Sequence, residues 1–430
     1  MKHLAFSGKG FFDKLGSALR DENVGERLAS DVAALLREVA RGGDRAVSAL
    51  TEKFDRVRIT PGAFQVEEDE FNAAPKGLAA KDRRALRSAV SCVRDFNRRS
   101  LPRNWSGRNP HGAIVGETYH PIRRAGVYVP GGRAPLLSSA VMTVTLAAIA
   151  GVPEIAVFSP PGSDGRIHPA TLAAVKLSGA TEVYRIGGVQ AVAAMAYGTE
   201  SISPVDKIFG PGNAYVVEAK RQVYGRVGVD LLPGPSEVMV IADASARPDW
   251  VAADLVAQAE HGHGGKIFLV GSEADLLHEV GVEARRQARE RTHREVVETT
   301  LRDHGYVIQV GNLEEAADVA NFVAPEHLEL HVEKSSQGKL RRAITTAGAV
   351  MEGGLTPTVL GDFTAGPSHV LPTGRSGRFF SGLRVADFLR RTSHLRYDEK
   401  SLKNALPVVE AFSRLENLDA HGRSASIRFE

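Results

Sequence analysis

The spacing of apolar residues divides the chain into a helical first part and an alternating second part. Over the first hundred residues, apolar positions recur three and four apart with charged residues on the opposite side, which predicts amphipathic helices over residues 27–39 and 82–98. From about Gly126, short apolar runs alternate with segments of helix length. This alternation is typical of βαβ units, because parallel strands need a crossover connection between them.

The apolar runs predict two parallel sheets. The first sheet would take its strands from residues 127–129, 155–158, 182–186 and 207–209, and the second from residues 238–241, 267–270, 307–310 and 328–332. Helices are predicted between them over residues 138–150, 169–177, 189–197, 250–260, 273–291 and 313–323. The expected fold class is therefore α/β, with two doubly wound, Rossmann-like parallel-sheet domains. The Pro/Gly-rich residues 355–377 are interpreted as an ordered loop system, and residues 385–416 as a short helical tail.

Composition narrows the class of protein. The 430 residues carry a net charge of +3, with 43% hydrophobic and 24% charged residues, which excludes a disordered chain, a coiled coil and a disulfide scaffold. The single cysteine, Cys92, cannot form an intramolecular disulfide and lies in a predicted amphipathic helix, so we interpret it as structural. The longest apolar run, residues 140–152, is shorter than the ~20 residues of a membrane helix, and no signal peptide precedes it. We expect a cytoplasmic protein without a membrane partner.

An excess of arginine between Arg83 and Arg108 allows two interpretations. The arginines could bind the phosphates of a nucleic-acid backbone, or they could form the solvent-exposed face of a helix. Apolar residues recur at helical spacing between the arginines, from Leu86 to Phe96, and no known nucleic-acid module accompanies them. The pattern favours the helix, and we expect no nucleic-acid partner.

Glycine-rich turns follow three of the predicted strands, at residues 129–132, 186–190 and 209–213. Ligands of open parallel sheets bind at the carboxyl ends of strands, where backbone N–H groups near a helix N-terminus suit a phosphate. None of the turns matches G-x-G-x-x-G, and each alone could be only a turn. Three on one sheet support one another and indicate a nucleotide site.

Polar residues further along the chain could carry chemistry. Gln258 and His261 are three apart and share a helical face, so they could supply two metal ligands, although such a pair also occurs by chance. Glu326 and His327 stand side by side just before a strand, which suits general acid–base work. The same pair could be a helix cap followed by an amphipathic strand.

Two later segments add candidates. Asp362 and His369 place two further candidate ligands in the loop system, and the tail carries Glu416 and His421.

Five longer motifs together resemble the histidinol dehydrogenase family. They are Val-Tyr-Val-Pro-Gly-Gly at 127–132, Gly-Pro-Ser-Glu at 234–237, Gln-Ala-Glu-His at 258–261, Ala-Pro-Glu-His at 324–327 and Ser-His-Val-Leu-Pro-Thr at 368–373. The match runs over nearly the whole chain, in order. The resemblance implies oxidation of L-histidinol through an aldehyde to L-histidine with two NAD⁺, at the end of histidine biosynthesis. It also implies zinc dependence and a homodimer whose C-terminal tail swaps between subunits.

The resemblance further implies roles for individual residues. The zinc ligands would be Gln258, His261, Asp362 and His421, the last from the partner subunit. His327 would take the hydroxyl proton, and Glu326 would activate water onto the aldehyde. The residues touching substrate would be Ser236, Gln258, His261, His327, Asp362, His369, Glu416 and His421, with Glu416 also from the partner. NAD would meet Tyr128, Gln190 and Asn213, each beside one of the three glycine-rich turns.

The same resemblance sets the expected domains. They are an N-terminal helical segment (1–24), a larger α/β domain with the zinc and catalytic residues (25–127 plus 238–382), a Rossmann-like NAD-binding domain (128–237) and a dimerisation tail (383–430). An alternative activity is that of a paralogous zinc- and NAD-dependent dehydrogenase of another small polar alcohol, such as a dihydroxypropanesulfonate. The Gly-Pro-Ser-Glu motif favours histidinol. Departures from the family's pattern occur at Leu136–Leu137 and at the extra His263.

Overall fold

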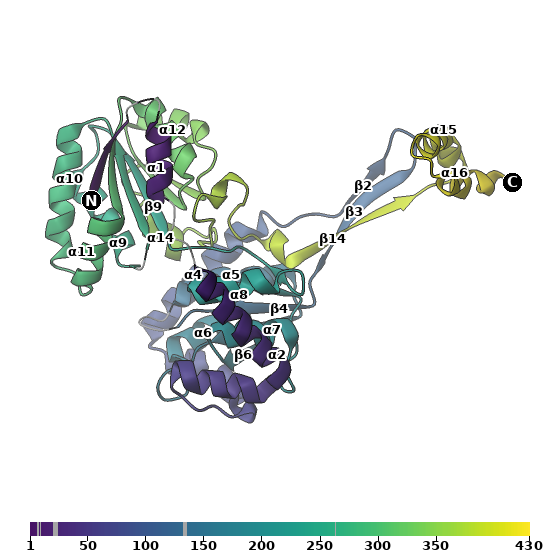
Figure 1. The fold of residues 1–430 in the computed structure, drawn as a ribbon, viewed down its shortest axis with the longest axis horizontal. Coiled ribbons are helices and arrows are strands. Elements are labelled where there is room, and N and C mark those ends of the chain that lie inside the picture. The colour runs from purple at the N-terminus through teal and green to yellow at the C-terminus, as the bar shows by residue number, and fades with distance from the viewer. Residues whose placement is uncertain (7, 9, 20–24, 132–135, 263) are drawn as a thin grey trace.

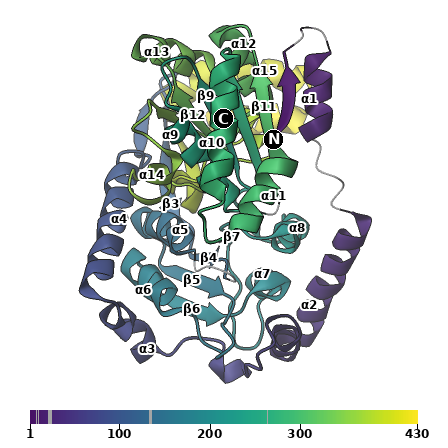
Figure 2. The ribbon, with the colours of Figure 1, turned by 90° about the vertical axis from the view of Figure 1, so that its left-hand side faces the viewer.

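The computed structural model describes residues 1–430 except 7, 9, 20–24, 132–135 and 263. Its described part forms two α/β lobes and an arm that extends away from both (Figure 1). Figure 2 shows the two lobes one above the other. Two positions named above lie outside the described residues: His263, and Gly132 at the end of the first glycine-rich turn.

The first lobe is built on a six-stranded parallel sheet in the order β1-β11-β10-β9-β12-β13. The strands are β1 (Lys2–Ala5), β9 (Glu237–Ala242), β10 (Lys266–Gly271), β11 (Gly305–Gln309), β12 (His327–His331) and β13 (Ala349–Glu352). One face is covered by α9 (Pro248–Ala259), α10 (Ala274–Ala288) and α11 (Arg294–His304), and the other by α1 (Phe11–Leu19), α12 (Leu313–Val323) and α13 (Lys334–Ala343). Alternate residues of β9 enter the two apolar clusters, which explains the unbroken apolar run of this strand.

The second lobe holds a five-stranded parallel sheet in the order β6-β5-β4-β7-β8. Its strands are β4 (Arg124–Tyr128), β5 (Glu154–Ser159), β6 (Glu182–Arg185), β7 (Lys207–Phe209) and β8 (Gly228–Val229). Its helices are α2 (Glu26–Asp55), α3 (Glu68–Ala73), α4 (Ala80–Arg98), α5 (Leu137–Ala150), α6 (Pro169–Ser178), α7 (Gly188–Tyr197) and α8 (Ala214–Val223). Short 3₁₀ turns cover Pro61–Ala63 and Ala74–Gly77.

The long N-terminal helices lie against this second sheet. Helix α2 packs on α7 and α8, and α4 packs on α5 and α6. This differs from the expectation, which grouped residues 25–127 with the first sheet. The reason is that an amphipathic pattern identifies the apolar face of a helix but not the sheet that the face covers. The expected N-terminal helical segment also contains a strand, because β1 pairs with β11 at the edge of the first sheet.

The arm is a three-stranded antiparallel sheet that carries the tail. It consists of β2 (Trp105–Arg108), β3 (Ile114–Pro121) and β14 (Leu389–Arg396), followed by α15 (Glu399–Leu415) and α16 (Asp419–Ser426). Short 3₁₀ turns at Ser376–Arg378, Val385–Phe388 and Ile427–Phe429 complete this end of the chain. The expected tail had no strand. Strand β14, with the sequence LRRTSHLR, is exposed along nearly its whole length and therefore lacks the apolar alternation that identifies a half-buried strand.

The strands and helices predicted from Gly126 to residue 332 are confirmed, and so are the helices predicted within α2 and α4. The loop system of residues 355–377 contains one short helix, α14 (Thr358–Phe363). Within the described part of the chain, no helix is both long and apolar enough to cross a membrane.

Candidate active site between the two sheets

The residues expected to do chemistry lie at the amino ends of two neighbouring strands. Ser236 directly precedes β9, Glu326 directly precedes β12, and His327 is the first residue of β12. His327 pairs in register with Val238 of β9, so the two strand starts lie side by side. This is the opposite end of the sheet from the carboxyl edge where ligands of open parallel sheets usually bind.

Two segments connect this edge to the second lobe. Residues 230–236 run directly from β8 to the start of β9. The loop after α14 also reaches across, because Val370 and Leu383 belong to the apolar cluster of the second lobe. The amino edge of the first sheet is therefore connected to the second lobe by two segments, residues 230–236 and the loop after α14.

Glu326 is a buried carboxyl group held by β9. Its Oε2 accepts hydrogen bonds from Ser236 Oγ at 2.7 Å and from the backbone N–H of Glu237 at 2.9 Å. Burial raises the pKa of Glu326, and the neighbouring His327 and these two hydrogen bonds only partly oppose it. This environment suits a carboxyl group that gains and loses a proton during a reaction.

His327 is oriented by the same strand. Its Nδ1 lies 3.3 Å from the backbone oxygen of Glu237 and 3.5 Å from Glu326 Oε2, so a proton on Nδ1 is donated to acceptors on that side. In this tautomer Nε2 carries the lone pair, and it lies 3.9 Å from Asp362 Oδ1. The imidazole thus presents its basic nitrogen toward α14.

Gln258, His261 and Asp362 line one small cavity. Gln258 lies in the last turn of α9, His261 follows the end of that helix, and Asp362 lies on α14. Within the described residues, the buried Nε2 of Gln258 has no hydrogen-bond partner. The orphaned Nε2 is a hydrogen-bond donor, so it fits an acceptor group of a bound molecule. The carbonyl oxygen of Gln258, the imidazole of His261 and the carboxylate of Asp362 form a set of nitrogen and oxygen donors that suits a zinc ion.

His369 lies beside the same carboxylate. Its Nδ1 is 3.3 Å from the backbone oxygen of Asp362 and 3.7 Å from Asp362 Oδ1. Burial lowers the pKa of His369, which favours its neutral form. The structure therefore brings together all the expected residues of the first lobe.

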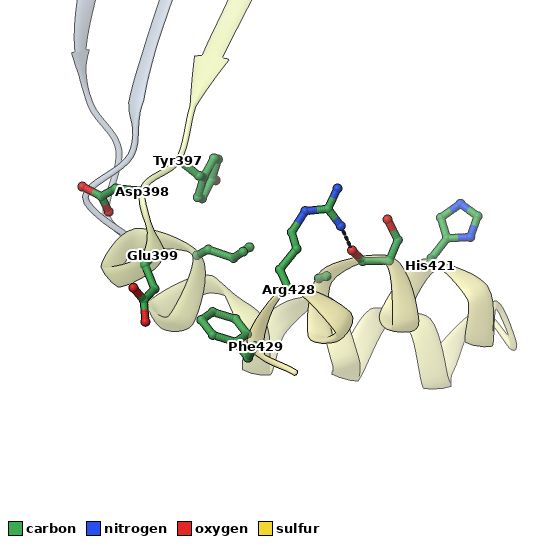
Figure 3. Close-up of a pocket in the computed structure, with 9 residues that line it drawn as sticks. Tyr397, Asp398, Glu399, His421, Arg428 and Phe429 are labelled. Atoms are coloured by element: carbon green, nitrogen blue, oxygen red, sulfur yellow. Dashed lines mark hydrogen bonds between the residues drawn. The ribbon is translucent and has the colours of Figure 1, made fainter.

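Glu416 and His421 are not brought to this cluster by their own chain. Both are exposed and lie on the tail at the far end of the arm (Figure 1). His421 lines a pocket formed entirely by residues 397–429, and Figure 3 shows it at the opposite end of that pocket from Tyr397 and Asp398. In this structure the tail therefore lies away from the first lobe of its own chain (Figure 1).

The expected NAD residues gather at the carboxyl edge of the second sheet. Tyr128 ends β4, Gln190 lies in the first turn of α7, and Asn213 precedes α8. Strands β4 and β7 are neighbours at the point where the strand order reverses, which is where doubly wound sheets bind nucleotides. At Gly210 the backbone has φ 104°, and a Cβ there would lie 2.2 Å from the backbone oxygen of Tyr128. Only glycine fits where these two turns meet.

These side chains already make internal contacts. The backbone N–H of Gly188 donates to Tyr128 Oη at 3.1 Å. Asn213 Oδ1 caps α8 by accepting from the N–H groups of Tyr215 and Val216 at 3.0 and 3.1 Å. Burial raises the pKa of Tyr128 to about 12, so its hydroxyl stays protonated. Gln190 Nε2 donates to Asp55 Oδ2 of α2 at 3.4 Å, so all three of these side chains are already engaged within the protein.

Sequence analysis missed a buried ion pair that supports this edge. Lys220 Nζ bonds to Asp230 Oδ1 and donates to the backbone oxygen of Gly210 at 2.8 Å, while Asp230 Oδ2 accepts from the N–H of Gly210 at 2.8 Å. Both side chains are almost fully buried. The pair fixes both polar groups of one glycine, but no local spacing links residues 220 and 230.

A second polar cluster was also missed. Asp254, Glu329 and His331 bring their potential ligand atoms within 4.8 Å of one another, an arrangement that could hold a metal ion. The available signal was the alternation His-Leu-Glu-Leu-His over β12, which predicts three polar side chains on one face of a buried strand.

Comparisons with known proteins agree over most of the chain. Residues 19–429 match the family model described as histidinol dehydrogenase. The histidinol dehydrogenase of Cereibacter sphaeroides is 46% identical over 402 residues, covering 93% of this chain and 91% of that protein. That of Moorella thermoacetica is 42% identical over 415 residues, with 96% of each chain covered. The crystal structure of histidinol dehydrogenase from Elizabethkingia anophelis matches with a TM-score of 0.95 at 31% identity, covering 100% of this chain and 98% of that one.

Proposed function

The chain belongs to the histidinol dehydrogenase family, and on this premise we propose that it oxidises L-histidinol to L-histidine in two steps with two NAD⁺. L-histidinaldehyde is the compound between the steps. The observation that carries the proposal is the pairing of Glu326 and His327 beside the cavity lined by Gln258, His261 and Asp362. This site joins two proton-handling groups to a set of metal-type donors.

His327 acts in the oxidation of the alcohol. Its Nε2 takes the hydroxyl proton while Nδ1 stays bonded toward the Glu237 carbonyl, which keeps the ring in one orientation. A histidine is suited to this task because its ordinary pKa lies near neutrality.

Glu326 acts in the oxidation of the aldehyde. Its carboxylate takes a proton from the water that attacks the carbonyl carbon, and no cysteine is required for this route. The hydrogen bonds from Ser236 Oγ and the Glu237 N–H hold one carboxylate oxygen in place. Ser236 and His369 border the site and contact the substrate.

Gln258, His261 and Asp362 would hold a zinc ion, together with the partner subunit's His421, and Tyr128, Gln190 and Asn213 would hold NAD⁺. When bound, zinc would supply a Lewis acid that anchors the substrate, and NAD⁺ would supply a hydride acceptor. Retaining the substrate on one set of side chains through both oxidations prevents release of a reactive aldehyde. The nitrogen and oxygen donors of Gln258, His261 and Asp362 around one cavity and the turns around Gly210 support these placements.

Measuring NADH formation from L-histidinol before and after zinc is removed and restored tests the proposal. We expect two NADH per histidinol, loss of activity without metal and recovery with zinc. If no NADH forms although zinc is bound, the result would indicate that the substrate is another small polar alcohol. A chain that binds no zinc at all would overturn the metal site.

We further propose that the active unit is a homodimer with exchanged tails. The tail lies far from the first lobe of its own chain (Figure 1), and several of its apolar side chains are strongly exposed, including Leu395, Phe412 and Leu415. Exposed apolar surface of this kind is typical of an interface. Both Glu416 and the ligand His421 would reach the site of the partner.

Co-expressing two inactive variants tests the exchange. Gln258→Ala damages the first lobe of one chain, and His421→Ala damages the tail of the other. If tails are exchanged, the mixed dimer contains one site with both residues intact, and activity returns. If each tail served its own chain, no combination would restore activity, and that result would overturn the exchange.

A further inference from the structure

Strand β12 carries a polar face that continues beyond the catalytic histidine. His327, Glu329 and His331 point to one side of the strand, whereas Leu328 and Leu330 enter an apolar cluster on the other. All five residues are buried. Glu329 and His331, which lie beyond His327 along the strand, need partners, because an isolated buried charge is strongly unfavourable.

The partners come from two helices. His331 Nε2 lies 3.1 Å from Glu329 Oε2 and 3.3 Å from Asp254 Oδ2 on α9. The other oxygen of Glu329 accepts two hydrogen bonds from Thr358, the first residue of α14, from its N–H and its hydroxyl at 2.7 Å each. One connected network therefore joins α9, β12 and α14.

These contacts stand one helical turn away from the proposed metal ligands. Asp254 is four residues before Gln258 on α9, and Thr358 is four residues before Asp362 on α14. Asp254, Glu329 and Thr358 also line the cavity that Gln258, His261 and Asp362 share. The network thus forms the inner wall of the proposed metal site.

Charge explains how the network holds together. Burial alone would lower the pKa of His331, but the bonds to Asp254 and Glu329 outweigh burial and raise the pKa to about 9. Burial would raise the pKa of Glu329, but the bonds from His331 and Thr358 hold it below its usual range. A cationic imidazole between carboxylates satisfies these groups without a metal ion.

We propose that Asp254, Glu329, His331 and Thr358 form a polar brace that fixes the spacing of α9 and α14 and so positions Gln258, His261 and Asp362 for metal binding. The proposal rests on the zinc site of the proposed function. Both oxygens of Glu329 are already engaged by His331 and Thr358, so we assign the four residues as positioning residues rather than metal ligands. Side chains behind a metal site that orient its ligands typically change metal affinity 10–100-fold when removed.

Replacing His331 tests the brace. In His331→Leu, two buried carboxylates lose the donor between them, and we expect the zinc dissociation constant to rise by about 10–100-fold. His331→Gln retains an amide that can donate to both carboxylates, so it should recover part of the loss. Zinc affinity is measured on the full-length protein by competition with a chelator, and the visible spectrum of the Co²⁺-substituted protein reports the ligand geometry.

A milder variant and a matched control separate positioning from folding. Thr358→Val removes one hydroxyl bond to Glu329 with little change in volume, and we expect a smaller rise of the zinc dissociation constant with an altered Co²⁺ spectrum. Thr300→Val removes a comparably buried hydroxyl from α11 in the same lobe, where it donates to the backbone oxygen of Val296. This control should leave both zinc affinity and the Co²⁺ spectrum unchanged.

The outcomes distinguish the brace from the site it supports. A wild-type chain that binds no zinc or cobalt would overturn the proposed function. Wild-type binding together with unchanged affinity and spectrum in His331→Leu and Thr358→Val would overturn the brace alone. Two zinc ions per subunit in the wild type and one in His331→Leu would show that Asp254, Glu329 and His331 bind metal themselves, which would also overturn the brace.

Discussion

The two parallel sheets present opposite ends to the region between the lobes, and those ends differ in chemistry. The amino edge of the first sheet carries ionisable side chains, with Glu326 and His327 near Asp362. The carboxyl edge of the second sheet carries glycine-rich turns whose side chains, such as Tyr128 and Asn213, are engaged in neutral hydrogen bonds. Charged groups described at the second edge include a buried pair beneath the turn, Lys220 and Asp230, and the carboxyl of Asp55 on α2, whose Oδ2 accepts from Gln190 Nε2 at 3.4 Å.

This difference suggests a division of labour. Groups that exchange protons need altered pKa values and access to a reacting molecule, whereas groups that shape a cofactor site need a fixed backbone. Substitutions at the first edge should therefore affect turnover more than stability, and substitutions at the second edge should do the reverse.

The largest expected effect is the loss of alcohol oxidation in His327→Asn. Removing a general base typically slows the dependent step by about 10²–10⁴-fold. The rate of NADH formation from L-histidinol measures this step, and thermal unfolding checks that stability is little changed. A rate close to wild type would remove His327 from the proposed role.

A comparable effect confined to the second step is expected for Glu326→Gln. Oxidation of L-histidinaldehyde should slow by about 10²–10⁴-fold, while oxidation of the alcohol stays near the wild-type rate. Assaying the two half-reactions separately, with histidinol and with the aldehyde as starting compounds, measures the split. Equal losses in both would contradict separate roles for Glu326 and His327.

At the second edge, Lys220→Met should act mainly on stability. It leaves Asp230 buried without its cation, which typically destabilises by about 3–5 kcal/mol. Denaturant unfolding measures this change. The matched control is Arg302→Met, which removes an exposed pair with Asp303 and should leave the free energy of unfolding almost unchanged. Similar losses in the two variants would erase the contrast between buried and exposed pairs.

The smallest expected effect is a pH dependence of stability due to His331. Its pKa of about 9 lies above the ordinary value of 6.5, so its contribution is fully present below pH 6.5 and is lost as pH rises through about 9. The facing groups are Asp254, whose pKa burial raises to about 6, and Glu329, whose pKa is lowered; both therefore titrate below that range. The contribution is on the order of 3 kcal/mol.

Denaturant unfolding of the wild type and of His331→Gln at about pH 7 and about pH 10 measures this dependence. The free energy of unfolding of the wild type should fall more from about pH 7 to about pH 10 than that of the variant. Parallel pH curves for the two proteins would mean that His331 is not charged in the folded state.

The alternation of strands and helices was predictable from sequence because buried parallel strands are continuous apolar runs, as in Val238–Ile241. The placement of Glu326 and His327 at the start of a strand followed from the same pattern, although His327 is already the first residue of β12. The arm did not, since an exposed strand such as β14 has no apolar period to detect. The buried polar cluster of Glu329 and His331 was not predicted, because residues 328–332 were interpreted as an apolar strand and its two ionisable side chains were not considered.

Contacts between segments that are distant in the sequence could not be predicted from it either. The spacing of Gln258 and His261 could be seen along the helix, but their meeting with Asp362 depends on how α14 packs. The same holds for Lys220 and Asp230, whose partnership depends on the path of the chain around Gly210.

Strand β1 has a consequence for the order in which the protein folds during synthesis. Its residues 2–5 are made first, yet their partner β11 spans residues 305–309, so the edge of the first sheet cannot close until most of the chain has left the ribosome. The second sheet, by contrast, draws on residues 124–229 and its covering helices on residues from 26 onward. We therefore expect the second sheet and its covering helices to form before the first sheet closes, while Val370, Leu383 and Phe388 pack on the second lobe only when the last part of the chain has been made.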